Sequence, residues 1–383
     1  MKTKLSVVAA MTLGIGGLLY SGCESMNNSN KGTITKSQFG HLPDGRPVDL
    51  YTLKNGKGME ARIATYGGIV TSLMVPDKTG RFSDVVLGYD NLDGYIKNNP
   101  FFGALIGRYG NRIANGRFTL DGATYVLPQN NGSNCLHGGI KGFDKVVWNV
   151  VKAEVKSDGP EIELSYLAKD GEEGFPGNLD VHALYQITEN NELKVSFRAK
   201  TDKKTVVNLT HHSYFNLRGQ GDVLNHMVTI NADRFTPVDA NLIPTGELRP
   251  VKGTPFDFTT PHTIGERINA QDEQIKLGNG YDHNWVANKG ADNLSLIATV
   301  SESTSGRVME VWSTEPGTQF YTGNFLDGSI TGKGNWVYAF RNGFCMEPQH
   351  YPDSPNKPQF PSTTLFPGET YKNTIIYKFS VKK

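Results

Sequence analysis

Two adjacent histidines, His211 and His212, are the first candidates for proton transfer in this sequence. Apolar and polar residues alternate around them, which predicts a β-strand, and neighbouring side chains on a strand point to opposite faces. His211 falls in step with the apolar residues Val207 and Leu209. His212 falls in step with polar neighbours, namely Asn208, Thr210 and Tyr214. We therefore predict that His212 can reach a substrate, and that His211 packs in the core or tunes its neighbour.

A second polar row lies in the segment Gly343–Gln349, where Glu347 alternates with Cys345. Pro348 is expected to stop this strand from pairing normally just beyond the acid. Aromatic residues on both sides favour partial burial, and burial raises the pKa of a carboxyl group. Because a carboxylate and an imidazole are well suited to exchanging protons near neutral pH, Glu347 and His212 form the candidate acid–base pair.

The elements that must position these residues are strands. The dominant period through most of the chain is two, and turn residues such as Asn55-Gly56 separate the alternating runs. Helical periodicity is confined to Leu92–Lys97 and Ile264–Leu277, each of which predicts one short helix. Many strands with few crossover helices predict an all-β fold, a large antiparallel β-sandwich in which one sheet face is open to solvent.

Composition excludes several classes of function. The 383 residues carry a net charge of +1, with no basic stripe among aromatic residues, so nucleic acid is not an expected partner. The three cysteines include no Cys-x-x-Cys pair, so neither a disulfide framework nor a zinc site is expected. No glycine-rich loop of the phosphate-binding or dinucleotide-binding type follows a predicted strand.

The first residues are typical of a targeting segment. Lys2 and Lys4 precede the apolar run Leu5–Tyr20, and small residues follow directly before Cys23. The run is shorter than the ~20 residues that a membrane-spanning helix needs. We predict a signal peptide over 1–22, a flexible tether rich in Ser and Asn over 23–36, and one domain over 37–383.

This targeting segment resembles a bacterial lipoprotein signal, in which Cys23 becomes the lipidated first residue. Tyr20 departs from that pattern, which usually has Leu at this place. The resemblance implies an exported protein, periplasmic or anchored to a bacterial membrane through a lipid on Cys23. The alternative is an ordinary secretory signal cut nearby, and in that case Cys23 has no special role.

Several motifs, taken in order, resemble those of the aldose 1-epimerases, or galactose mutarotases. They lie between Asp49 and Lys378 and are Gly107–Gly116, Leu136–Asp144, Asn208–Leu217, Tyr281–Asn284, Gln319–Asp327 and Cys345–Tyr351. The resemblance implies the β-sandwich of the galactose mutarotases. It also implies an isomerase that interconverts the α and β anomers of free aldohexoses, such as glucose and galactose, by opening and reclosing the ring.

The same resemblance implies a role for each matching residue. His212 is the general acid that protonates the ring oxygen, and Glu347 is the general base that takes the proton from the C1 hydroxyl. The residues that bind the sugar are Asn111, Arg112, His137, Asp282 and Gln319. Because only protons move, neither a metal nor another cofactor is expected, and the partner is a monosaccharide.

Three alternatives stay open on the residues alone. A glycoside hydrolase or lyase needs two carboxylates beside the scissile bond, and Glu347 with Asp282 is a candidate pair. A sugar-binding module would use the same polar row without proton transfer, and a sugar-phosphate epimerase would show more arginines beside Arg112. The preferred aldose and the oligomeric state stay open. The effects of two departures from the family also stay open. His211 stands where many relatives have Asn, which could change the protonation of His212, and Pro348 stands where many have a small polar residue, which could change the exposure of Glu347.

Overall fold

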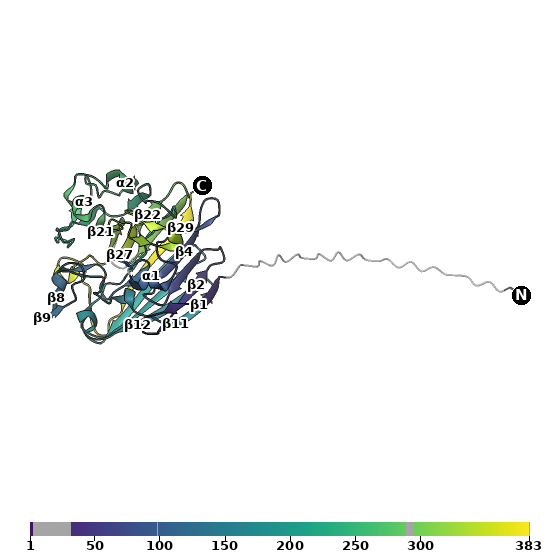
Figure 1. Cartoon of the computed structure of the whole chain (residues 1–383), viewed down its shortest axis with the longest axis horizontal. Coiled ribbons are helices and arrows are strands. Elements are labelled where there is room, and N and C mark those ends of the chain that lie inside the picture. Colours follow the sequence, from purple (N-terminus) through teal and green to yellow (C-terminus); the bar gives the residue numbers. More distant parts are fainter. Residues whose placement is uncertain (3–31, 98, 289–293, 383) are drawn as a thin grey trace.

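The computed structural model describes residues 1–2, 32–97, 99–288 and 294–382, and these are built mainly of antiparallel strands (Figure 1). The α-helices are short: α1 (Leu92–Lys97), α2 (Ile264–Arg267) and α3 (Glu273–Gly278). A search of the described helices finds none with the length and apolar character to cross a membrane. The all-β class with few short helices is confirmed.

The largest element is a nine-stranded antiparallel sheet with the order β11-β12-β13-β14-β29-β23-β22-β17-β20. Its strands are β11 (Asn149–Lys156), β12 (Gly159–Ala168), β13 (Leu179–Ile187), β14 (Glu192–Thr201), β29 (Tyr371–Val381), β23 (Arg307–Ser313), β22 (Ser295–Ser301), β17 (Met227–Ile230) and β20 (His262–Thr263). Along β14, Leu193, Val195 and Phe197 are buried, whereas Arg198 and Lys200 are exposed. This sheet therefore has one covered face and one open face, as the alternation predicted.

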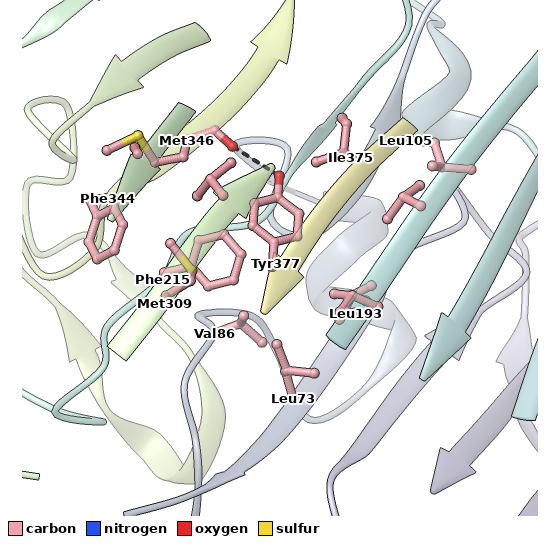
Figure 2. Close-up of a cluster of buried hydrophobic side chains, with 14 of the residues drawn as sticks. Leu73, Val86, Leu105, Leu193, Phe215, Met309, Phe344, Met346, Ile375 and Tyr377 are labelled. Carbon is pink, nitrogen blue, oxygen red and sulfur yellow. Dashed lines mark hydrogen bonds between the residues drawn. The ribbon is translucent and has the colours of Figure 1, made fainter. Parts of the chain in front are cut away.

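Two five-stranded sheets cover the buried face. The first contains β1 (Thr33–His41), β2 (Pro47–Lys54), β3 (Glu60–Ala64), β4 (Val70–Pro76) and β5 (Phe82–Asp84), and the second contains β19 (Arg249–Pro250), β18 (Arg234–Thr236), β21 (Asp282–Val286), β24 (Gly317–Tyr321) and β27 (Cys345–Gln349), each in that order. Residues of all three sheets meet in one apolar core, among them Leu73, Tyr377 and Met346 (Figure 2). The predicted β-sandwich is confirmed.

Short paired strands complete the fold and carry part of the candidate site. They are β6 (Ala104–Ile106) with β16 (Thr210–His212), β7 (Arg112–Ile113) with β10 (Cys135–Leu136), β8 (Arg117–Leu120) with β9 (Ala123–Val126), β15 (Thr205–Val206) with β28 (Thr364–Leu365), and β25 (Ile330–Thr331) with β26 (Val337–Tyr338). The hairpin β8–β9 stands out at one side of the body (Figure 1).

The predicted tether over 23–36 ends too late. Strand β1 begins at Thr33, and residues 33–36 already pair with residues 51–54 of β2. The β-branched side chains of Thr33, Ile34 and Thr35 suit such a strand. The remainder of the predicted tether, the predicted signal peptide after residue 2, and Cys23 lie outside the described residues.

Two local predictions were also too simple. The Asn55-Gly56 turn is part of a longer loop over residues 55–59, in which the Asn55 side-chain oxygen accepts hydrogen bonds from the Lys57 and Met59 amides at 3.0 and 2.9 Å. The single helix predicted over Ile264–Leu277 is divided into α2 and α3. A new helix begins because the Asp272 carboxylate caps the amides at the start of α3.

Candidate active site

A cavity of about 500 Å³ contains the predicted acid–base pair and most of the predicted sugar-binding residues. Strand β16 supplies His212, β27 supplies Glu347 and β21 supplies Asp282. Segments outside the second five-stranded sheet add Asn111, Arg112 and His137. Of the seven predicted residues, Gln319 alone is not in the lining, and it lies directly behind Asp282. The fold thus brings together residues that are far apart in the sequence.

The acid–base pair is close and buried. The Nε2 atom of His212 lies 3.5 Å from Oε2 of Glu347, and the two residues are 4% and 2% exposed. Oε2 makes no hydrogen bond within the described protein, so it can accept one from a sugar hydroxyl. On the far side of the imidazole, Nδ1 lies 3.7 Å from the Cys345 sulfur. A thiol is both a weak donor and a weak acceptor, so this contact is compatible with Nδ1 in either protonation state.

Burial works against the charged form of both members of the pair. It lowers the pKa of His212 to about 4. It also raises the pKa of Glu347 well above its ordinary value; the charge of Asp282 adds to this increase and Arg112 opposes it. A neutral imidazole beside a protonated carboxyl is therefore favoured over the ion pair, and the two arrangements contain the same number of protons.

The ring of His137 is oriented by a backbone amide. The amide N–H of Asn111 donates to Nδ1 of His137 at 3.1 Å, and the amide of His137 donates to the Asn111 carbonyl, also at 3.1 Å. Both residues have a positive φ, 62° and 52°, and Gly138 follows because a Cβ there would collide with the Gly107 carbonyl oxygen. Since Nδ1 accepts a hydrogen bond, the imidazole proton is on Nε2, which makes His137 a donor towards the cavity.

His137, His212 and Glu347 also have the composition of a metal site. One possible ligand atom from each lies within 4.8 Å of the others. A histidine that binds a metal through one nitrogen usually donates a hydrogen bond from the other, which orients the ring. At His137 the second nitrogen instead faces a donor, the Asn111 amide. The arrangement therefore suits a hydrogen-bond donor to an oxygen better than a metal ligand.

A second polar chain lies beside the pair. The Arg112 Nη2 atom is 3.8 Å from Oδ2 of Asp282, and the Gln319 amide donates to Oδ1 of Asp282 at 2.7 Å. Burial raises the pKa of Asp282, while the positive charge of Arg112 and the Gln319 hydrogen bond oppose the increase. Arg112 is also oriented by the side-chain oxygen of Asn131, which accepts from its Nε at 3.1 Å. Gln319 thus acts on the cavity through Asp282.

Side chains alternate between the two faces of a strand, and this rule correctly placed His211 and His283 on the opposite face from their neighbours His212 and Asp282. His211 is fully buried between the rings of Tyr185 and Tyr377. His283, next to Asp282, is fully buried against Phe256. Burial lowers the pKa of both histidines to about 3, so both are neutral core residues.

The sequence-based prediction missed the aromatic and loop residues of the cavity. Tyr321 is two residues from Gln319 on β24, and its position could have been found by the same alternation. Phe101 packs on the rings of His137 and His212 at centroid distances of 4.6 and 5.7 Å. The other missed residues include Phe325, which is 60% exposed, and the loop residues Asn241 and Leu242.

Comparison with known proteins agrees with this geometry. Residues 49–378 match the family model for aldose 1-epimerase. The chain is 48% identical over 352 residues to a galactose mutarotase from Bos taurus, covering 91% of this chain and 99% of that protein. The chain belongs to the aldose 1-epimerase family. It is an isomerase, and the mutarotase reaction expected from its motifs is confirmed.

Two further similarities support membership of the aldose 1-epimerase family. An aldose 1-epimerase from Escherichia coli (strain K12) is 39% identical over 340 residues, covering 88% of this chain and 96% of that protein. A crystal structure of a galactose 1-epimerase from Lactobacillus acidophilus superimposes with a TM-score of 0.81 at 29% identity, covering 93% of this chain and 100% of that one. The roles of the individual residues stay predictions.

The state of His137 can be measured without any substrate. We expect ¹⁵N NMR of the histidine rings to show His137 neutral at neutral pH, with its proton on Nε2, because burial lowers its pKa well below the ordinary value. The signal is assigned by its loss in His137→Gln. A His137 ring that is protonated on Nδ1, or that titrates near 6.5, would contradict the described hydrogen bond.

Proposed function

We propose that this aldose 1-epimerase interconverts the α and β anomers of glucose and galactose by acid–base catalysis between His212 and Glu347. The observation that supports this assignment is the 3.5 Å approach of His212 Nε2 to Glu347 Oε2, both buried at the wall of a cavity of about 500 Å³. The relatives named galactose mutarotase and galactose 1-epimerase support galactose as a substrate.

Ring opening moves two protons and breaks one bond. The Glu347 carboxylate takes the proton of the C1 hydroxyl, a C=O bond forms at C1, and the bond from C1 to the ring oxygen breaks with its electron pair moving to that oxygen. His212, as the imidazolium, donates the Nε2 proton to the ring oxygen. Rotation about C1–C2 then presents the other face of the aldehyde, and the reverse transfers close the ring as the other anomer.

Burial favours the outcome of these proton transfers. The form of the pair that reacts is the imidazolium and carboxylate, which is the less favoured arrangement, and ring opening leaves a neutral imidazole beside a neutral carboxyl group. A buried environment raises the free energy of the charged pair relative to the neutral one. The pKa directions of His212 and Glu347 therefore favour the state that accompanies the open-chain sugar.

The remaining polar residues orient the sugar. His137 donates from Nε2, the Arg112 guanidinium presents a planar set of donors, and the Asp282 carboxylate accepts from hydroxyls. The side-chain oxygen of Asn111 accepts from the main-chain amide of Arg112 at 2.8 Å, so its side-chain nitrogen is the group that would donate to a hydroxyl. Gln319 orients Asp282. These groups recognise hydroxyls by hydrogen bonds, which matches an uncharged aldose.

Removal of either proton carrier should slow catalysis strongly. With α-glucose and α-galactose freshly dissolved, polarimetry should show that the protein accelerates the approach to anomeric equilibrium. We expect Glu347→Gln and His212→Ala each to lower the rate by ~10²–10⁴-fold, the usual contribution of a positioned acid or base.

Matched controls test whether lost activity is only lost stability. Glu302→Gln and His226→Ala change equally buried residues that do not line the cavity, and both should keep nearly full activity while folded. Unchanged rates in Glu347→Gln and His212→Ala would contradict the assignment. Release of reducing ends from an oligosaccharide would favour a hydrolase, and sugar binding without acceleration would favour a binding module.

The pH dependence follows from the shared proton of the pair. Activity requires one proton on the pair, so it should fall on the acid side when His212 takes up a second proton, below its lowered pKa of about 4. It should fall on the alkaline side only when Glu347 loses its proton, and burial raises that pKa. Stopped-flow polarimetry should therefore show a broad plateau through pH 6.5. A rate that declines as the pH rises through 6.5 would contradict this account.

We also infer that the protein is exported and attached to a bacterial membrane through a lipid on Cys23. The order of Lys2 and Lys4, the apolar run Leu5–Tyr20 and Cys23 supports this proposal. Strand β1 begins at Thr33, so the chain between Cys23 and the domain is a short connection. Lipid attachment would hold the domain at the membrane surface.

Lipidation can be detected directly in a bacterial host. We expect the chain to incorporate a labelled fatty acid and to sediment with membranes, and Cys23→Ser to lose the label and the sedimentation. Cys135→Ser is the control, because Cys135 is a buried cysteine of the domain. A secreted chain without label would instead support an ordinary secretory signal.

A further inference from the structure

Strands β16 and β27, which carry His212 and Glu347, lie side by side without a continuous backbone ladder. β27 is the last strand of its sheet, and β16 is paired on its other side with β6. Backbone atoms join the two segments at one end, where the amides of Phe215 and Phe344 donate to each other's carbonyls at 2.6 and 2.9 Å. The free edge of β27 beyond Phe344 must satisfy its backbone groups in another way.

Side chains complete this edge. The Tyr377 hydroxyl donates to the Met346 carbonyl at 2.9 Å (Figure 2). The Thr210 hydroxyl donates to the Pro348 carbonyl at 2.8 Å. Proline has no N–H, so this carbonyl is the only main-chain hydrogen-bonding group that residue 348 offers. Pro348 lies in a strand at the edge of its sheet. The prediction that it stops normal pairing is wrong on the other side, where the strand stays paired with β24 through Gln349.

The Asn208 side chain forms the next connection and reaches a third segment. Its oxygen accepts from the His350 amide at 3.0 Å, and its nitrogen donates to the His350 carbonyl at 3.3 Å, as a backbone amide would in a ladder. The same nitrogen donates to the Gly110 carbonyl at 3.1 Å. Gly110 precedes Asn111, so one buried amide links the segments of the acid, the base and the sugar-binding residues.

Connections through side chains hold two backbones farther apart than the ~4.7–4.9 Å of a regular ladder. The His212 and Glu347 side chains approach each other across this connection, at 3.5 Å. Asn208 and Thr210 are both fully buried and bonded, so neither contacts a substrate. We propose that Thr210 and Asn208 are positioning residues, which set the separation of the acid from the base; this inference rests on the proposed function of that pair.

The two residues should give different kinetic effects. Thr210→Val keeps the shape but removes the bond to the Pro348 carbonyl, so we expect kcat to fall ~10–100-fold with KM within about threefold, the scale of a small misplacement. Thr210→Ser keeps the hydroxyl and should restore kcat. Asn208→Asp loses both donations and also loosens Gly110, so it should lower kcat and raise KM together.

Two controls remove comparable bonds elsewhere. Thr188→Val removes a buried hydroxyl that donates to Glu192 at 2.9 Å. Asn55→Asp changes a buried amide that donates to the Thr188 carbonyl and to Asn191 at 2.8 and 2.9 Å. Both should lower the melting temperature of the full chain and leave kcat and KM unchanged. If Thr210→Val leaves kcat and KM unchanged, as Thr188→Val should, Thr210 is merely structural and the inference is wrong.

A measurement without turnover separates this inference from the proposed function. When the connection through Thr210 is lost, water should reach the pair. The pKa of His212, measured by NMR titration, should then rise towards 6.5 in Thr210→Val but not in Thr188→Val. If the unaltered chain fails to accelerate anomer exchange, the proposed function fails, and this titration still tests the positioning role. An unchanged His212 titration would overturn that role; Asn208→Asp provides the same test should Thr210→Val fail to fold.

Discussion

The burial of an imidazole and a carboxyl group within 3.5 Å of each other is the constraint on which the rest of this structure depends. In water a glutamate side chain is charged near neutral pH, and an imidazole, with an ordinary pKa of about 6.5, is only partly charged. Burial makes the charged arrangement costly, so the pair favours a neutral imidazole beside a neutral carboxyl group. Main-chain groups buried beside the pair also need hydrogen-bond partners.

The β-sandwich meets this requirement at the free edge of β27, where side chains bond to main-chain groups. An open edge of β27 would expose main-chain groups that attract water or another strand. Side chains of Tyr377, Thr210 and Asn208 cover those groups instead. These main-chain groups of the strand that carries Glu347 are therefore hydrogen-bonded without a regular ladder on that side.

The surroundings of the pair distinguish a proton-transfer site from a metal site of the same composition. His137 receives the Asn111 amide at Nδ1, so its Nε2 is a donor. Arg112, Asp282 and Gln319 form a separate chain of polar contacts beside it. Phe101 and Tyr321 line the cavity, and Phe101 packs on the His212 ring. Two separate groups of polar residues thus meet at one cavity.

The sequence by itself determined the all-β class, the opposite orientations of His211 and His212, and the reaction, because alternation is a local signal and several motifs in order are a cumulative one. The sequence did not predict which strands pair. Thr33 joins a strand because β2 lies beside it, and the Ser- and Asn-rich composition of the neighbouring segment does not indicate this pairing. The positive φ values of Phe101 and Leu242, 67° and 59°, were not predicted either, because neither residue is a glycine. Only the tertiary structure decided that β16 and β27 meet through side chains, since the bonds of Thr210 and Asn208 join residues more than 130 positions apart.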